Sequence, residues 1–204
     1  MKTITPKLIT QNPTLFYENF SNNNANWEIT QNDKESAAIT TNGYELKNTD
    51  EDVWHHFSVF PEIGNTKNIR MRCLLEIDPK SDLGQIGIIW GFDQKMSNLN
   101  RLCISTNGTG CSVLHFTKNH CPVFFRFFDP FFSIGKTNKV LFEVREYKNY
   151  YFFRINKKLA YVGHVSHFAD EGNGFGIYID PGVSASVKKI KISRTTSNTV
   201  FSLN

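Results

Sequence analysis

At 204 residues, 40% of them hydrophobic and 14% aromatic, the chain has enough apolar side chains to bury a large core, which excludes a disordered protein. Its net charge of +4 comes from 23 basic and 19 acidic residues scattered along the chain, so nucleic acid is not an expected partner. No apolar run has the length of a membrane span, and no Sec signal peptide is visible. We therefore expect one soluble cytoplasmic domain, residues 1–204 with a core at about 16–194, that contacts no membrane; export by a route other than Sec stays open.

The first predicted strands follow turn signals. An Asn-Gly pair at 42–43 opens a short alternating run, and residues 52–60 (DVWHHFSVF) are rich in aromatic and β-branched side chains. The next run alternates strictly and ends at the pair Asp78-Pro79, which predicts the end of a strand. Its apolar face carries Ile69, Met71, Cys73, Leu75 and Ile77.

Residues 84–93 (GQIGIIWGFD) raise a question, because only one face of the predicted strand is apolar. The alternation predicts a core face made of Ile86, Ile88, Trp90 and Phe92. The opposite face carries Gly87 and Gly91 and is nearly bare. Glycine weakens a strand unless another backbone or a ligand must come close. The bare face is therefore either the floor of a binding groove or a surface on which the later Phe-rich segment packs.

Two further strands are predicted over residues 98–117. In the first, Leu102 and Ile104 point inward while Arg101 and Cys103 point outward; in the second, Leu114 and Phe116 share an apolar face, with His115 on the other. Residues 120–138 (HCPVFFRFFDPFFSIGKTN) alternate poorly, so we expect an aromatic-rich connection with at most a short strand.

Regular alternation returns in the last third of the chain. Residues 138–162 predict two or three antiparallel strands that turn at 148–149 and 156–158, and two more strands follow at 174–180 and 187–193. More than ten strands with frequent turn signals and no helical period predict an all-β fold, an antiparallel sandwich or barrel.

The cysteines predict neither disulfides nor a metal centre. They have no CxxC spacing and no secretion signal precedes them, so we expect reduced thiols, with Cys73 buried and not bonded to Cys103. We predict no zinc site, because a cysteine and a histidine adjacent in sequence rarely reach one ion together. The residues weighed for zinc are Cys111, His115, His120 and Cys121.

A resemblance follows from the order of these segments. The stretches FYENFSNNNANWEI, TTNGYELKN, LGQIGIIWGFD, FEVREYKNYYFFRINKKLAYV and GFGIYID, over roughly residues 16–192, resemble the concanavalin A-like lectin/glucanase jelly rolls. More narrowly, they are similar to the laminin-G-like and 3-keto-disaccharide-hydrolase-type (DUF1080-like) domains of bacteria. The resemblance implies a two-sheet antiparallel β-sandwich (jelly roll) whose ligands lie on the concave sheet face or at its rim.

Combined with the alternation, the resemblance predicts a non-catalytic module that binds carbohydrate on that face. Directional hydrogen bonds to sugar hydroxyls require polar side chains above small floor residues. The expected ligand-binding residues are Gly87, Gly91, Asp93, Asn98, Asn100, Arg101, His115 and Arg126. Phe124 or Phe127 is expected to stack on a sugar ring, whereas Trp90 is expected in the core.

The first alternative is a protein-interaction module or a homo-oligomer that uses the Phe-rich segment 124–132. Its apolar patch consists of Phe124, Phe127, Phe128 and Phe131. The ligand is thus either a glycan or a protein.

The second alternative is a glycoside hydrolase-like enzyme, since glucanases of this resemblance carry a catalytic Glu-x-Asp-x-x-Glu strand. The closest string here supplies Glu76, Asp78 and Asp82, but Pro79 interrupts the strand that would align the carboxylates. We therefore predict no catalytic residues.

The resemblance also implies a structural calcium ion near the first and last strands. Its candidate ligands are Glu18, Asn19 and Asp180. Because no dense Asp cluster is present, we expect no metal and no cofactor.

Overall fold

The computed structural model describes residues 13–62, 67–96, 98–117, 123–128, 138–168 and 172–195, and of 123–128 the backbone alone. In these ranges we find fifteen strands and one short 3-10 helix, Val165–His167, so no described helix has the length and apolarity to cross a membrane. The strands are β1 (Thr14–Glu18), β2 (Thr30–Gln31), β3 (Glu35–Thr40), β4 (Gly43–Asn48), β5 (His55–Val59), β6 (Ile69–Ile77), β7 (Gln85–Phe92), β8 (Asn98–Ser105), β9 (Gly110–Thr117), β10 (Val123–Phe128), β11 (Lys139–Tyr147), β12 (Tyr150–Ile155), β13 (Lys158–His164), β14 (Gly174–Ile179) and β15 (Ser184–Arg194).

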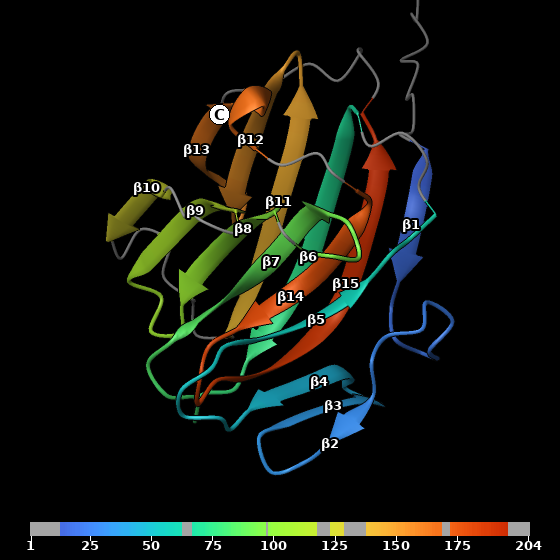
Figure 1. Cartoon of the computed structure of the whole chain (residues 1–204), viewed down its shortest axis with the longest axis vertical. Coiled ribbons are helices and arrows are strands. Elements are labelled where there is room, and N and C mark those ends of the chain that lie inside the picture. The colour runs from blue at the N-terminus through green and yellow to red at the C-terminus, as the bar shows by residue number, and fades with distance from the viewer. Residues whose placement is uncertain are drawn as a thin grey trace, which may run out of the picture.

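The strands form two antiparallel sheets that stack face to face (Figure 1). The larger sheet has the order β13-β12-β11-β6-β15-β4-β3-β2, and β1 pairs with β15 beyond the end of β4. The smaller sheet has the order β10-β9-β8-β7-β14-β5. The predicted all-β, two-sheet antiparallel sandwich is therefore confirmed.

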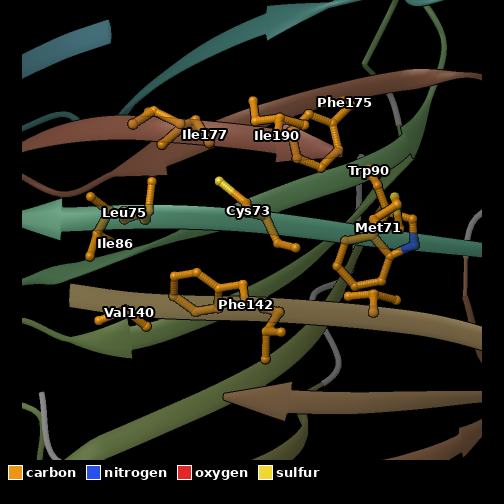
Figure 2. Close-up of a cluster of buried hydrophobic side chains, with 14 of the residues drawn as sticks. Met71, Cys73, Leu75, Ile86, Trp90, Val140, Phe142, Phe175, Ile177 and Ile190 are labelled. Atoms are coloured by element: carbon orange, nitrogen blue, oxygen red, sulfur yellow. The ribbon is translucent and has the colours of Figure 1, made fainter. Parts of the chain in front are cut away.

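One core fills the space between the inner faces of the two sheets (Figure 2). All five apolar residues predicted for the inner face of β6 are buried. From the smaller sheet, Trp90 reaches across to Phe153 and Tyr151 of β12, with ring centroids 5.8 Å and 6.3 Å apart. The prediction that Trp90 belongs to the core is confirmed, and each such side chain contributes about 1.5–3 kcal/mol by burial.

Strand β7 departs from the predicted alternation at Gly91. This residue has a φ of +77°, and the register with β14 shifts beside it, so that Trp90 pairs with Phe175 and Phe92 with Gly174. The extra residue is a β-bulge, which turns Phe92 to the outer face of the smaller sheet. The prediction that Phe92 shares the core face of Trp90 is wrong, because side chains alternate only while the backbone stays extended.

Gly87 lacks a side chain for a different reason. A Cβ atom there would lie 2.0 Å from the carbonyl oxygen of Leu102 and 2.7 Å from the Sγ atom of Cys103, both on the neighbouring strand β8. The close approach of β8 therefore requires glycine at this position. The expected packing of the Phe-rich segment on these glycines concerns side chains outside the described residues.

The turns of the last third agree with the prediction. Lys148 and Asn149 have φ values of 48° and 65°, and Asn156 and Lys157 have φ values of 49° and 71°. Two consecutive residues with positive φ make the type I′ turns that match the twist of a hairpin. The strands β11, β12 and β13 consequently lie side by side in chain order.

A buried carboxylate organises the outer face of the larger sheet. The Oε2 atom of Glu143 accepts hydrogen bonds from the Nε atoms of Arg70 (2.9 Å) and Arg72 (2.7 Å), and its Oε1 atom accepts one from Arg154 Nη1 (3.1 Å). Burial alone would raise the pKa of Glu143, but the charges and hydrogen bonds of Arg70 and Arg72 outweigh it and lower the pKa. This cluster ties together β6, β11 and β12.

We expect the two glycines of β7 to resist substitution for separate reasons. Gly91→Ala should lower the free energy of unfolding by about 1–2 kcal/mol because of its positive φ. Gly91→Asn should cost less, because asparagine tolerates that backbone region better. Gly87→Ala should cost about 1–3 kcal/mol by pushing β7 from β8. Urea denaturation measures all three; a neutral Gly91→Ala would contradict the bulge.

Glu143→Gln should leave three arginines without their shared counter-charge. We expect a loss of about 2–3 kcal/mol, below the roughly 3–5 kcal/mol of fully buried pairs, because the Arg72 side chain is 42% exposed. Because the folded-state pKa is lowered, this contribution is complete above the ordinary glutamate pKa and is lost as the pH falls through the folded value. The difference between the denaturation midpoints of the two proteins should therefore be constant from pH 6 to 8, shrink as the pH falls below the ordinary glutamate pKa of about 4.3, and vanish below the lowered folded-state pKa. A difference that persists at low pH would contradict this account.

Candidate ligand-binding site

A pocket of about 480 Å³ opens on the outer face of the smaller sheet. This volume lies in the range of small-molecule sites. Strands β14, β7, β8 and β9 form its floor, and the segments before β5 and after β7 form its rim. The lining residues are Trp54, Ile89, Lys95, Met96, Leu99, Arg101, Phe116, Thr117 and Tyr178.

The floor is a second apolar cluster, separate from the main core. It consists of Ile89, Phe92, Leu99, Cys103 and Tyr178, with Met96 and Phe116 packed against it. The bulge at Gly91 supplies one of its members, since it turns Phe92 outward. Many antiparallel sheets turn a polar face to the solvent, so a buried apolar cluster on this outer face distinguishes the smaller sheet from an ordinary solvated one.

The turn after β7 places the cationic side chain of Lys95 at the rim of the pocket. The Oδ1 atom of Asp93 accepts hydrogen bonds from the backbone amides of Lys95 (2.9 Å) and Met96 (3.2 Å). Asp93 thus shapes the turn, while Met96 and the exposed Lys95 line the pocket.

Arg101 is the buried cation of the pocket and is only 8% exposed. Its guanidinium carbon lies 4.0 Å from the ring centroid of Tyr178 and 4.9 Å from that of Phe116. Tyr178 belongs to β14, and β7 separates that strand from β8. On β7, the residue that pairs with Tyr178 is Gly87. Because Gly87 has no side chain, the ring of Tyr178 can cross β7 toward Arg101.

Arg101 stays charged although it is buried. Burial lowers its pKa, but the nearby Cys103, Tyr178 and Asp180 outweigh that effect and raise the pKa above its ordinary value. Burial also raises the pKa of Cys103 to about 12 and that of Tyr178 further, so both groups are neutral at physiological pH and, of the three neighbours, only the charge of Asp180 acts on Arg101 there. Asp180 accepts hydrogen bonds from the Tyr178 hydroxyl and from the Gln85 amide (2.7 Å).

Trp54 is an exposed aromatic residue at the pocket that the sequence analysis did not identify. Its side chain is 41% exposed, and its ring centroid lies 5.4 Å from that of Tyr178 and 5.8 Å from that of His56. The alternation of residues 52–60 put Trp54 on the face of His56, and His56 pairs with Tyr178. That shared face was the available signal.

The structure places His115 and Asn100 away from the pocket, which corrects two predicted site residues. Asn100 is fully buried; it donates to the Trp90 carbonyl (3.3 Å), and its Oδ1 atom lies 3.1 Å from His115 Nδ1. His115 lies on the same face of β9 as the core residue Val113, and Asn100 pairs with His115, so both point to the inner side of the sheet; Phe116 packs with the outer cluster. The sequence predicts that Leu114 and Phe116 face the core, but they lie on the outer face of β9, which is apolar too.

The remaining predicted residues lie in the backbone of β7, at the start of β8 and in or after β10. Gly87 and Gly91 serve the backbone, as described above, and Asn98 begins β8 opposite Thr117. Arg126 lies in β10, whose backbone pairs with β9 at the edge of the smaller sheet. Phe124, Phe127 and Phe128 lie in the same strand. For these three residues and Arg126 the structure describes the backbone but not the side chain, and Phe131 lies outside the described residues.

The acidic residues of the glucanase-like string, Glu76, Asp78 and Asp82, lie at and after the end of β6 and do not line the pocket. Strand β6 ends at Ile77, as the Asp78-Pro79 pair predicted. Glu76 lies on the outer face of the larger sheet, where its Oε2 atom pairs with Lys188 Nζ at 3.2 Å. Asp78 accepts from the Lys80 amide (2.9 Å) and so shapes the turn that follows the strand.

The remaining predictions concern the cysteine thiols and the candidate metal ligands. Cys73 is buried, and Cys73, Cys103 and Cys111 are free thiols, as predicted; Cys121 lies outside the described residues. Of the calcium candidates, Glu18 accepts from the Phe20 amide (2.7 Å). Within the described ranges, no three His, Cys, Asp or Glu side chains group as a metal site would require.

Comparison with known proteins identifies the fold. No protein-family model matches the chain, and no curated protein sequence matches it. Among solved structures, it is similar to the carbohydrate-binding module CBM66 from Bacillus subtilis, with a TM-score of 0.59 and 13% identity over 80% of this chain and 94% of that one. It is also similar to a protein of unknown function with a galectin-like fold from Bacillus subtilis, with a TM-score of 0.63 and 12% identity over 89% and 96% of the two chains.

A third similar structure is an enzyme, the β-glucanase of Bacillus licheniformis. Its TM-score is 0.59, with 10% identity over 90% of this chain and 99% of that one. Identities this low show the fold alone. The chain therefore has the concanavalin A-like jelly-roll fold that its sequence resembles, while the narrower laminin-G-like and 3-keto-disaccharide-hydrolase resemblance stays a prediction.

Proposed function

We propose that the protein is a non-catalytic carbohydrate-binding module whose ligand lies in the pocket on the outer face of the smaller sheet. One observation carries the proposal: the exposed ring of Trp54 stands beside a pocket of about 480 Å³ that also contains a fixed cation. An exposed aromatic ring next to a few directed polar groups suits a sugar, which presents both a C–H face and hydroxyls. The similarity to a carbohydrate-binding module supports the same function.

The side chains of the pocket divide the work of recognition. Trp54 offers a flat apolar surface to the C–H face of a sugar ring, and Leu99 and Phe116 exclude water from the floor. Lys95, Thr117 and the guanidinium of Arg101 are the polar groups that orient the hydroxyls or other oxygens of the ligand.

The acidic side chains support the non-catalytic part of the proposal. Retaining hydrolysis requires two carboxyl groups about 5 Å apart on either side of one glycosidic bond. Among the residues that the structure describes, none of the nine that line the pocket is acidic. Glu76, the first residue of the glucanase-like string, lies on the other sheet and pairs with Lys188.

Trp54→Ala tests this function on a glycan array and by calorimetry with the glycans that bind. We expect the affinity to fall at least about tenfold, because truncation of an aromatic side chain that anchors a ligand commonly costs about 2 kcal/mol or more. The fold should persist, since Trp54 is only half-buried. Tyr17→Ala is the matched control, since Tyr17 is also an exposed aromatic residue (50% against 41% for Trp54) but lies on β1 of the larger sheet. Equal affinity of the Trp54→Ala variant and the unchanged protein would contradict the site.

A protein-interaction module is the second candidate, favoured by the position of β10. This strand pairs with β9 alone among the described strands and thus ends the smaller sheet. An edge strand offers free backbone groups to a strand of another chain, including a second copy. In that case light scattering should show a mass that rises with protein concentration and that Phe127→Ser reduces, while the glycan array stays negative.

A further inference from the structure

The charges of the pocket point to one class of carbohydrate, an inference that rests on the proposed function. The nine described residues that line the pocket include two cations, Lys95 and Arg101, and no carboxylate. A neutral sugar would require neither charge. The surplus is local, since the chain as a whole carries 23 basic and 19 acidic residues.

Within the described part of the chain, Arg101 forms no ion pair with a carboxylate. Its buried Nε atom has no hydrogen-bond partner in those ranges either. Asp180, the acidic neighbour that influences its pKa, already accepts hydrogen bonds from Tyr178 and Gln85. Buried charges are ordinarily paired, so a buried guanidinium beside an open pocket is placed for an anion from outside.

The geometry of Arg101 also suits a planar anion. The rings of Tyr178 and Phe116 lie 4.0 Å and 4.9 Å from its guanidinium carbon and hold the group in place before a ligand arrives. A guanidinium presents paired donors that match the two oxygens of a carboxylate. Lys95, on the rim, adds a second, flexible charge.

We propose that the carbohydrate bound in this pocket carries a carboxylate, as a uronic acid does, and that the carboxylate meets the guanidinium of Arg101 while the sugar ring lies toward Trp54. The apolar floor of Leu99 and Phe116 removes water from the ion pair and so strengthens it. The ring supplies the C–H face for Trp54, and the acid supplies the charge that the pocket lacks.

Matched pairs of sugars test this proposal with the full chain. Oligomers of glucuronic, galacturonic and mannuronic acid are compared by calorimetry with their carboxyl-reduced counterparts, the same sugars without the charge. We expect at least one acid form to bind about tenfold or more tightly than its reduced form, a preference of about 1.4 kcal/mol. The preference should weaken as salt is raised.

Two variants locate the charge. Arg101→Gln should abolish the preference for the acid form, with thermal melts to confirm that it folds. Lys95→Gln, at an exposed position, should fold normally and reduce the preference about twofold to fivefold, as expected for a rim charge. Lys47→Gln, an exposed lysine on β4 of the larger sheet, is the matched control and should change nothing.

The outcomes separate the two proposals. Equal binding of acid and reduced sugars, still dependent on Trp54, would overturn the carboxylate proposal and leave the carbohydrate function standing. Acid preference that survives both Arg101→Gln and Lys95→Gln would also overturn it. If no sugar of either form binds, the proposed function itself falls, and this inference falls with it.

Discussion

The packing of two sheets on one shared core is the constraint from which the other features follow. Every strand of the core region must turn one apolar face inward, and β6 does so without interruption from Ile69 to Ile77. Burial of these side chains is the main favourable term in the stability of such a fold. Because inner positions are committed to the core, ligand contacts can come only from outer faces, edges and turns.

The outer faces of the two sheets carry different kinds of side chains. The larger sheet carries a charged cluster in which one carboxylate, Glu143, receives hydrogen bonds from three arginines. The smaller sheet carries a second apolar cluster and a single buried arginine, Arg101. The arginines around Glu143 stabilise the larger sheet, whereas Arg101 lies between the rings of Tyr178 and Phe116 and forms no ion pair within the described ranges, which is why we propose it as the group that meets a ligand.

The two glycines of β7 connect the backbone to this difference. Gly91 forms the bulge that adds Phe92 to the outer cluster, and Gly87 lets β8 approach while the ring of Tyr178 leans toward Arg101. Neither glycine touches the ligand in this account. Both are required because the pocket needs side chains from four strands, β14, β7, β8 and β9, to meet on one face.

Local pattern by itself determined most strands from residue 43 onward, the hairpin turns at 148–149 and 156–158, the buried face of β6 and the end of that strand before Pro79; it did not identify β1, β2 or β3. The features that it determined depend on neighbours in the chain, through alternation and turn chemistry. Alternation also placed Arg101 on the outer face. It did not decide which face of β9 was inner, so His115 was assigned to the wrong side, and it did not foresee the bulge at Gly91. Trp54 and Arg101 are 47 residues apart, and only the pairing of β5, β14, β7 and β8 brings them to one pocket, because strand order is set by contacts between residues distant in sequence.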